Sequence, residues 1–218
     1  MNQQSRNVDY SDLREQMVKD QLLARGISNP RVIQAMRHIK RHNFVPLHLL
    51  SDAYKDSALP IGFGQTISQP YIVAHIAELL DLSPTDTVFE VGAGSGYQAA
   101  VISRLANRVI TVESIASLVN AAQNRFVCMG INNVFVFEGD GGMGMPEQGP
   151  YDAILISAAS PRIPCPLILQ LKFGGRLVAP IGSSSNQNIV LYKRLETHST
   201  KENLTPVRFV PLTGKWGF

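Results

Sequence analysis

The chain has 218 residues, of which 44% are hydrophobic and 17% charged, and its 20 basic and 17 acidic residues give a net charge of +3. This length suits one α/β domain with a full core, and the near-balance of charge argues against a nucleic-acid-binding protein. The polar start, the lack of an apolar run of about 20 residues and the two cysteines argue against a signal peptide, a membrane span and a disulfide framework. We therefore expect a cytoplasmic protein in which Cys128 and Cys165 are reduced core residues.

Two helices are predicted at the start of the chain. The first spans residues 11–25, ends at Gly26 and turns four apolar side chains to one face: Leu13, Met17, Val18 and Leu22. The second begins at Asn29-Pro30, where a capping side chain precedes a proline in the first turn. These helices predict a helical cap over residues 1–60.

The second helix ends in the cluster RHIKRH, residues 37–42. His38 and His42 have the i, i+4 spacing of metal ligands on a helix, but they lie among cations and lack a nearby carboxylate or thiol. We interpret the cluster as a solvated helix end and predict no metal site.

The stretch PIGFGQTISQPY, residues 60–71, precedes the helical run YIVAHIAELL. Ser68, two residues before Pro70, suits a helix start with a hydroxyl cap. A surface helix does not need Gly62, Gly64 and the sequence Thr-Ile-Ser in front of it. The stretch therefore indicates a helix start that holds a ligand, and a cap without further role is the alternative.

From Thr85 onward, short apolar runs alternate with helical stretches. Continuous apolar strands that are separated by helices predict a parallel sheet covered on both faces. The runs NIVLYKRLE and VRFVPL have no full helix between them, so they predict an antiparallel pair of strands at the edge. The fold class is therefore α/β, with a Rossmann-like, mostly parallel sheet, an antiparallel C-terminal edge and an N-terminal helical cap.

A glycine turn in VFEVGAGSGYQAA, residues 88–100, joins a predicted strand to a predicted helix. Such a turn is the usual ligand crevice of an open α/β sheet, and a tight turn without a ligand is the alternative. Gly92, Gly94 and Gly96 leave Tyr97 where a dinucleotide fingerprint has its third glycine. This spacing argues against NAD.

Three carboxylates accompany the glycine turn. Glu113 ends the next strand, where its oxygens can accept hydrogen bonds from both hydroxyls of a ribose. Glu90 lies inside the first strand, where a buried carboxylate needs a donor such as a ligand amine. Asp140, followed by Gly141, ends the third strand and suits an adenine-side contact, although it could also only initiate a loop. The whole pattern is typical of S-adenosylmethionine-dependent methyltransferases, so we predict that cofactor.

Five segments resemble the protein-L-isoaspartate O-methyltransferase family, in family order over about residues 10–215. The glycine turn is shared by many methyltransferases, whereas the GQTISQP run is characteristic of this family. Residues 1 to about 9 look like an added tail. The segments are ALPIGFGQTISQPY (58–71), VFEVGAGSGYQAAV (88–101), YDAILISAASPRIP (151–164), GGRLVAPIG (174–182) and RFVPLTG (208–214).

The resemblance implies a class I methyltransferase fold with a seven-stranded sheet, in one domain over residues 1–218 with the cofactor-binding sheet and C-terminal strands in 61–218. It implies methyl transfer from S-adenosylmethionine to the α-carboxylate of L-isoaspartyl residues in age-damaged proteins and peptides, with S-adenosylhomocysteine as the product. Acceptance of D-aspartyl sites stays open. We expect a monomer without nucleic-acid or membrane partners. The family's active-site serine corresponds to Ser68.

The sequence around Ser68 suits a carboxylate substrate, which wants backbone N–H donors, a hydroxyl and the positive end of a helix. In this interpretation Thr66 lies on the cofactor side and Ile67 on the substrate side, and the RFVPL run adds Arg208 and Val210 for the peptide. A carboxylate with a pKa near 3.5 to 4 is already a nucleophile at pH 7, so no general base is needed. His75 is interpreted as a packing residue.

Two other functions stay open at this stage. A methyltransferase for a small-molecule acid would share the cofactor motifs. A non-catalytic binding domain could retain the fold, but it would have no physical need to keep the glycine turn, Glu113 and Ser68 together.

Overall fold

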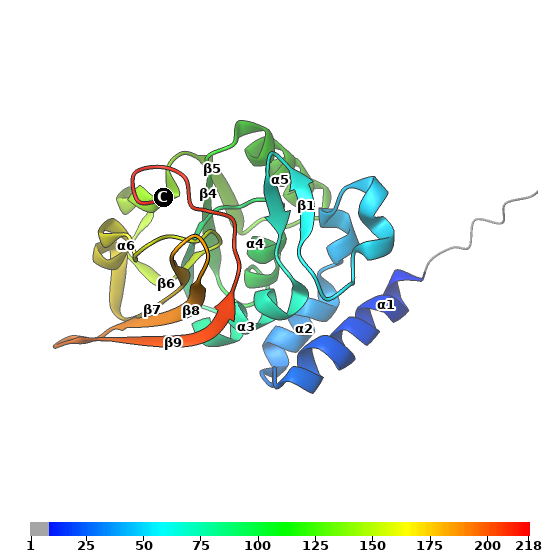
Figure 1. Ribbon diagram of the computed structural model, residues 1–218, viewed down its shortest axis with the longest axis horizontal. Helices are drawn as coiled ribbons and strands as arrows, with labels where there is room; N and C mark the ends of the chain where they lie inside the picture. Colours follow the sequence, from blue (N-terminus) through cyan, green and yellow to red (C-terminus); the bar gives the residue numbers. More distant parts are fainter. Residues whose placement is uncertain (1–8) are drawn as a thin grey trace, which may run out of the picture.

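The computed structural model describes residues 9–218, so the predicted tail lies outside the described residues except for Asp9. Seven strands form one sheet in the order β5-β4-β3-β6-β7-β8-β9 (Figure 1). The neighbours from β5 to β7 pair in parallel, whereas β8 and β9 are antiparallel to their neighbours. The predicted mostly parallel sheet with an antiparallel edge is confirmed. The strands are β3 (Thr87–Val91), β4 (Arg108–Glu113), β5 (Val134–Glu138), β6 (Tyr151–Ile156), β7 (Leu171–Gly182), β8 (Gln187–Arg194) and β9 (Ser199–Val207).

The strand order reverses at β3, which pairs with β4 on one side and β6 on the other. Ligands of open α/β sheets bind at such a reversal, outside the carboxyl ends of the strands. A separate two-stranded hairpin, β1 (Leu59–Gly62) and β2 (Gln65–Ile67), lies close to this edge (Figure 1). The fold therefore brings the hairpin and the glycine turn, which are far apart in the sequence, to one place.

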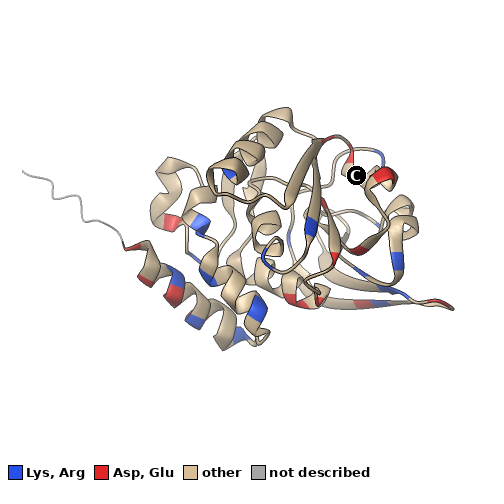
Figure 2. Ribbon diagram, turned by 180° about the vertical axis from the view of Figure 1, so that it is seen from behind, with Lys and Arg blue, Asp and Glu red and all other residues tan. Residues whose placement is uncertain are grey.

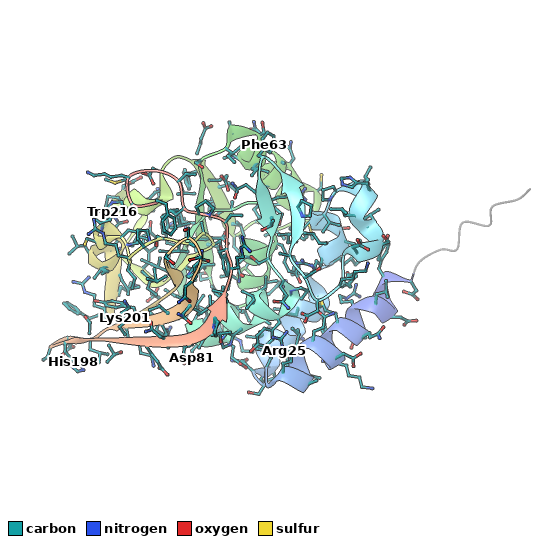
Figure 3. All side chains as sticks on the ribbon, viewed as in Figure 1. Arg25, Phe63, Asp81, His198, Lys201 and Trp216 are labelled. Atoms are coloured by element: carbon teal, nitrogen blue, oxygen red, sulfur yellow. The ribbon has the colours of Figure 1, made fainter. Side chains whose placement is uncertain are left out.

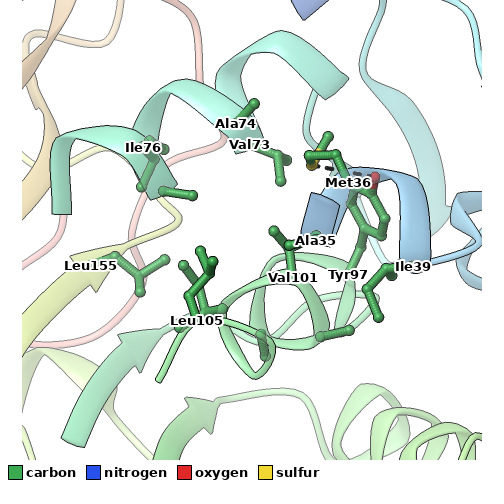
Figure 4. Close-up of a cluster of buried hydrophobic side chains, with 14 of the residues drawn as sticks. Ala35, Met36, Ile39, Val73, Ala74, Ile76, Tyr97, Val101, Leu105 and Leu155 are labelled. Carbon is green, nitrogen blue, oxygen red and sulfur yellow. Dashed lines mark hydrogen bonds between the residues drawn. The ribbon is translucent and has the colours of Figure 1, made fainter. Parts of the chain in front are cut away.

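Helices cover both faces of the sheet. On one face, α2, α3, α4 and α5 share a hydrophobic cluster with residues such as Val88, and Figure 4 shows Met36, Val73 and Tyr97 meeting there. On the other face, α6 packs in a second cluster with residues such as Phe89. None of the helices within residues 9–218 is long and apolar enough to cross a membrane. The helices are α1 (Tyr10–Met17), α2 (Pro30–His38), α3 (Pro70–Leu80), α4 (Tyr97–Ile102), α5 (Ala116–Cys128) and α6 (Cys165–Gln170).

The two predicted N-terminal helices are present, and they pack in the same cluster as α3 and α4. The first begins as α1, continues through a π-helical segment (Val18–Leu22) and a 3₁₀ turn (Leu23–Arg25), and ends at Gly26 with φ of 89°. The second has the predicted cap, because the Asn29 side chain accepts hydrogen bonds from the backbone at Arg31 and Val32.

The interpretation of residues 37–42 as a solvated helix end is wrong for Arg41, which is fully buried. Its Nε donates to the carbonyl of Ala53 at 2.8 Å, and its guanidinium lies 5.0 Å from the ring centre of Tyr97. Burial lowers the pKa of Arg41 to about 10. His42 is also engaged, because its Nδ1 lies 2.9 Å from the hydroxyl of Tyr54. Arg41 and His42 therefore hold the loop at Ala53 and Tyr54, which precedes the hairpin.

Two further expectations are wrong in part. Cys128 and Cys165 are free, but both are exposed at helix ends and do not belong to the core. The run RFVPL is not a strand, because β9 ends at Val207. After that residue the backbone bonds to a loop, since Ala159 donates to the Val210 carbonyl and accepts from the amide of Leu212. The run therefore leaves the sheet and crosses its carboxyl edge.

Candidate active site

A cavity, called the main cavity here, opens over the carboxyl ends of the parallel strands around β3. Parts of the chain from residue 65 to residue 214 contribute walls, including the hairpin and the C-terminal segment that follows β9 (Figure 1). The lining residues are 65–68, 73, 91–95, 97, 98, 112–114, 139–141, 157, 158 and 210–214.

The glycine turn forms the floor of the main cavity. Gly92 and Gly94 line it and have φ angles of 89° and 52°, which residues with a side chain rarely adopt. Gly96 does not line it. A Cβ at Gly96 would lie 2.8 Å from the ring of Phe126, so this glycine allows α5 to pack closely. The structure therefore assigns two of the three predicted glycines to the cavity and the third to helix packing.

Glu113 is the carboxylate beside the glycine turn. Its Oε2 accepts from the Gly94 amide at 2.9 Å, and its Oε1 accepts from the Ile115 amide at 3.1 Å. The residue is buried, yet it lines the main cavity. Because each carboxylate oxygen can accept more than one hydrogen bond, Glu113 keeps capacity for donors on a ligand.

Asp140 and Gly141 form the far wall. Asp140 accepts from the amides of Gly142 and Lys215, each at 3.0 Å, so it initiates a loop and also holds the C-terminal segment. A Cβ on Gly141 would lie 2.7 Å from the side chain of Val91, which explains why a glycine follows Asp140. Both residues line the main cavity, so the loop-initiating role and a ligand contact are compatible.

Glu90 lies on β3 beneath the turn and does not line the main cavity. The hydroxyl of Thr111 donates to it at 2.7 Å, and that of Ser157 at 3.4 Å. Burial raises the pKa of Glu90 to about 8, against the opposing effect of these two hydrogen bonds. Glu90 is therefore protonated at pH 7, and its position does not support the predicted direct contact with a ligand amine. Its link to the cavity runs through Ser157, which does line it.

Ser68 does not cap α3. The N-cap residue is Gln69, and the cap makes no side-chain hydrogen bond. Ser68 is half-buried and lines the main cavity together with Thr66 and Ile67. The interpretation of Ser68 as a cap alone is therefore wrong, and the residue borders a space where a ligand could meet it.

A second concavity, called the side groove here, begins where the main cavity meets Thr66 and Ser68. Arg208 lines this groove, whereas Val210 lines the main cavity, so the structure separates the two substrate residues predicted from RFVPL. His75 lies behind the groove, where its Nε2 is 3.2 Å from the hydroxyl of Thr205. The groove is lined by residues 25, 58, 66, 68, 69, 72 and 205–209.

Sequence reasoning missed several lining residues. Ser157 follows β6, and its place could have been inferred, because β6 is the strand that pairs with β3 across the reversal. Ser114 and Thr213 approach each other with their hydroxyls 3.3 Å apart. Thr213 could not have been inferred, since nothing in the sequence shows that the chain crosses the cavity after β9.

The residues of the main cavity fit S-adenosylmethionine. In the part of the chain that the structure describes, Glu113 and Asp140 are the only charged residues lining it. Two carboxylates suit a ligand that carries ribose hydroxyls, an adenine amine and positive charge. The glycine turn adds backbone N–H groups at the start of α4, where a ligand can approach the backbone closely.

Comparison with known proteins gives a consistent result. The model of the family described as protein-L-isoaspartate(D-aspartate) O-methyltransferase matches residues 13–217. The chain is 50% identical over 208 residues to a protein-L-isoaspartate O-methyltransferase of Methanoregula boonei, covering 95% of this chain and 96% of the relative. It is 50% identical over 215 residues to protein-L-isoaspartate O-methyltransferase 2 of Pelobacter propionicus, covering 98% and 95%.

Two solved structures are also similar. One is a protein-L-isoaspartate O-methyltransferase with 32% identity and a TM-score of 0.85, and the match covers 94% of this chain and 67% of that one. The other is a putative protein-L-isoaspartate O-methyltransferase of Plasmodium falciparum, solved in complex with S-adenosyl-L-homocysteine. It shares the fold at 23% identity and a TM-score of 0.78, with 92% of this chain and 98% of that chain covered.

Proposed function

The chain belongs to the protein-L-isoaspartate(D-aspartate) O-methyltransferase family, and on that premise we propose how its residues carry out the reaction. The enzyme transfers a methyl group from S-adenosylmethionine to the free carboxylate of isoaspartyl residues in damaged proteins, which begins their repair. S-adenosylhomocysteine is the other product. The fold is that of the class I methyltransferases.

We propose that the main cavity holds the cofactor. Glu113 accepts hydrogen bonds from its ribose, Asp140 with Gly141 borders its adenine, and the backbone at Gly92 and Gly94 closes around it. Thr66 forms the wall on the hairpin side. When bound, S-adenosylmethionine supplies an electrophilic methyl group on a sulfonium.

Ser68 orients the substrate in this proposal. Its hydroxyl is not used for capping, so it can donate to one oxygen of the acceptor carboxylate and leave the other free to react. The carboxylate is ionised at pH 7 and needs no base. Ile67 and Val210 exclude water, which strengthens the attraction between opposite charges that the reaction cancels. His75 stays outside the reaction.

One observation carries the proposal. Thr66 and Ser68 line both the main cavity and the side groove, so a ligand in one meets a ligand in the other at the same strand end. A peptide in the side groove can therefore present a short branched carboxylate at Ser68, while its main chain stays in the groove.

A matched pair of peptides tests the proposal: one with an isoaspartyl residue, the other identical with a normal aspartyl residue. We expect the isoaspartyl peptide to be methylated at least on the order of a hundred times faster. In the aspartyl peptide, the side-chain carboxylate would lie about 1 Å from the position that the reaction requires. Comparable rates would contradict the proposed pocket. Efficient methylation of a small free acid would instead favour a small-molecule carboxyl methyltransferase.

We also propose that residues 1–218 work as one domain and as a monomer in the cytoplasm, without nucleic-acid or membrane partners. Two free cysteines are typical of a reducing compartment. Basic and acidic residues both occur along α1 (Figure 2), and the near-balance of 20 basic and 17 acidic residues over the chain argues against a nucleic-acid partner. Light scattering of the purified protein tests the monomer, and a mass of twice the chain's own would contradict it.

A further inference from the structure

The side groove has an unusual charge for a protein whose cations and anions are nearly balanced. Within residues 9–218, its only charged lining residues are Arg25 and Arg208. One comes from the helical cap and the other from the segment that follows β9, so the two cations reach the groove from opposite ends of the chain. The lining includes no carboxylate, and Asp56, which pairs with Arg25, lies outside it.

Arg25 is held in a fixed position. Its guanidinium lies 3.6 Å from the ring centre of Tyr71, and that ring stacks on His75. His75 in turn contacts Thr205, which also lines the groove. Figure 3 shows Arg25 between the N-terminal helices and α3, near the end of β9. A stacked guanidinium loses less side-chain entropy when it binds a carboxylate.

Both arginines have free capacity. One nitrogen of Arg25, Nη1, pairs with Asp56 at 3.1 Å, and this pair is about 40% exposed on each side. A guanidinium has five N–H donors, so donors on the other nitrogens of Arg25 are not used by this ion pair. Arg208 is exposed and makes no ion pair with any residue in the described part of the chain. Two cations with unused donors attract anions into the groove.

From this placement we propose that Arg25 and Arg208 determine specificity, by binding a carboxylate that flanks the isoaspartyl residue in the substrate peptide. The carboxylate is a glutamate or aspartate side chain or the peptide's C-terminus. The inference rests on the proposed function, because the groove leads to Ser68. The acceptor carboxylate itself lies at Ser68, so it is not the group that the arginines hold. An ion pair on the acceptor would weaken it as a nucleophile.

The test uses isoaspartyl peptides that carry Glu or Gln at successive flanking positions. We expect Glu to lower KM by about threefold on one side of the isoaspartyl residue only, with kcat unchanged, because partly exposed ion pairs are weak. The difference should disappear at about 0.5 M salt, where screening acts over a few ångströms. It should shrink in Arg25→Gln and in Arg208→Gln, and persist in Arg25→Lys.

Arg37→Gln is the matched control, because Arg37 pairs with Glu15 at 3.0 Å in an ion pair outside the groove that is about as exposed as that of Arg25. This variant should keep the full preference for Glu. Two results would overturn the inference, provided that the enzyme still methylates the Gln peptide. One is equal KM values for the Glu and Gln peptides in the unmodified enzyme. The other is a preference for Glu that survives in the Arg25→Gln, Arg208→Gln double variant. Failure to methylate any isoaspartyl peptide would instead contradict the proposed function, and the inference with it.

Discussion

The main cavity and the side groove share a wall at Thr66 and Ser68 but have opposite charge. Glu113 and Asp140 are the charged residues of the main cavity in the described part of the chain, and Arg25 and Arg208 are those of the groove. The cavity thus favours a ligand with donors and positive charge, and the groove favours a ligand with carboxylates. The difference indicates that charge directs each of the two substrates to its own side of Ser68.

The two regions also differ in construction. The main cavity has a floor of buried strand ends and glycines whose conformation and close packing leave little freedom, whereas the charged residues of the groove, Arg25 and Arg208, are long and exposed. Loss of a residue in the cavity should therefore affect binding strongly. Loss of a residue in the groove should change preference among peptides by small factors.

The largest expected effect is at the shared wall. Ser68→Ala should reduce the methylation rate of an isoaspartyl peptide by on the order of a hundredfold, because the acceptor carboxylate loses its orienting donor. Cofactor affinity and thermal stability should change little, since Ser68 does not cap α3. The exposed serine variant Ser11→Ala serves as the control. Near-normal turnover in Ser68→Ala would show that the hydroxyl does not orient the substrate.

The next effect concerns the cavity alone. Glu113→Ala should weaken S-adenosylmethionine binding by about 1 to 3 kcal/mol, because charge-assisted hydrogen bonds to the ribose are lost. Glu113→Gln keeps one acceptor oxygen and should lose less. Calorimetric titration measures both. An unchanged affinity in Glu113→Ala would show that Glu113 does not bind the ribose.

Beneath the cavity, Glu90 should make stability depend on pH. Its folded pKa of about 8 lies above the ordinary value of 4.5, so the unfolded chain releases this proton first as pH rises. The free energy of unfolding should therefore fall between about pH 5 and pH 8, by on the order of 1 kcal/mol per pH unit, and the loss should be complete above pH 8. Urea unfolding of Glu90→Gln should show a flatter profile. Parallel profiles for the two proteins would argue against a protonated Glu90.

The smallest expected effect is on the chemical step itself. Single-turnover rates should be nearly constant from about pH 6 to 8, because the acceptor carboxylate is already ionised and no base takes part. Burial lowers the pKa of His75, and this residue lies behind the groove, so His75→Gln should keep the same profile. An ascending limb with a midpoint near pH 6.5 would require an essential histidine.

Much of the main cavity could be predicted from local sequence. Gly92, Gly94 and Glu113 follow strands whose apolar patterns mark them clearly, and parallel strands bring their carboxyl ends to one edge. Ser68 could be found through a characteristic run of residues. These features are encoded within short stretches, so each motif predicts its own position in the fold.

The groove, the hydrogen-bond donors of Glu90 and the burial of Arg41 could not be predicted, because they depend on contacts between distant segments. Arg41 resembles a surface residue in sequence, yet the loop at Ala53 and the ring of Tyr97 enclose it. The RFVPL run has the composition of a strand, but its backbone partners lie in the loop at Ala159. Hydrophobic periodicity shows which residues are apolar and does not show which segment they meet.

One experiment tests the separation of the two recognition sites most directly: cofactor affinity and peptide KM measured side by side in Glu113→Ala and in Arg208→Gln. We predict that Glu113→Ala weakens S-adenosylmethionine binding and leaves the KM of an isoaspartyl, Glu-flanked peptide unchanged at saturating cofactor. Arg208→Gln should raise that KM and leave cofactor affinity unchanged. A change of similar size in both quantities in either variant would contradict the claim that charge sorts the two substrates to opposite sides of Ser68.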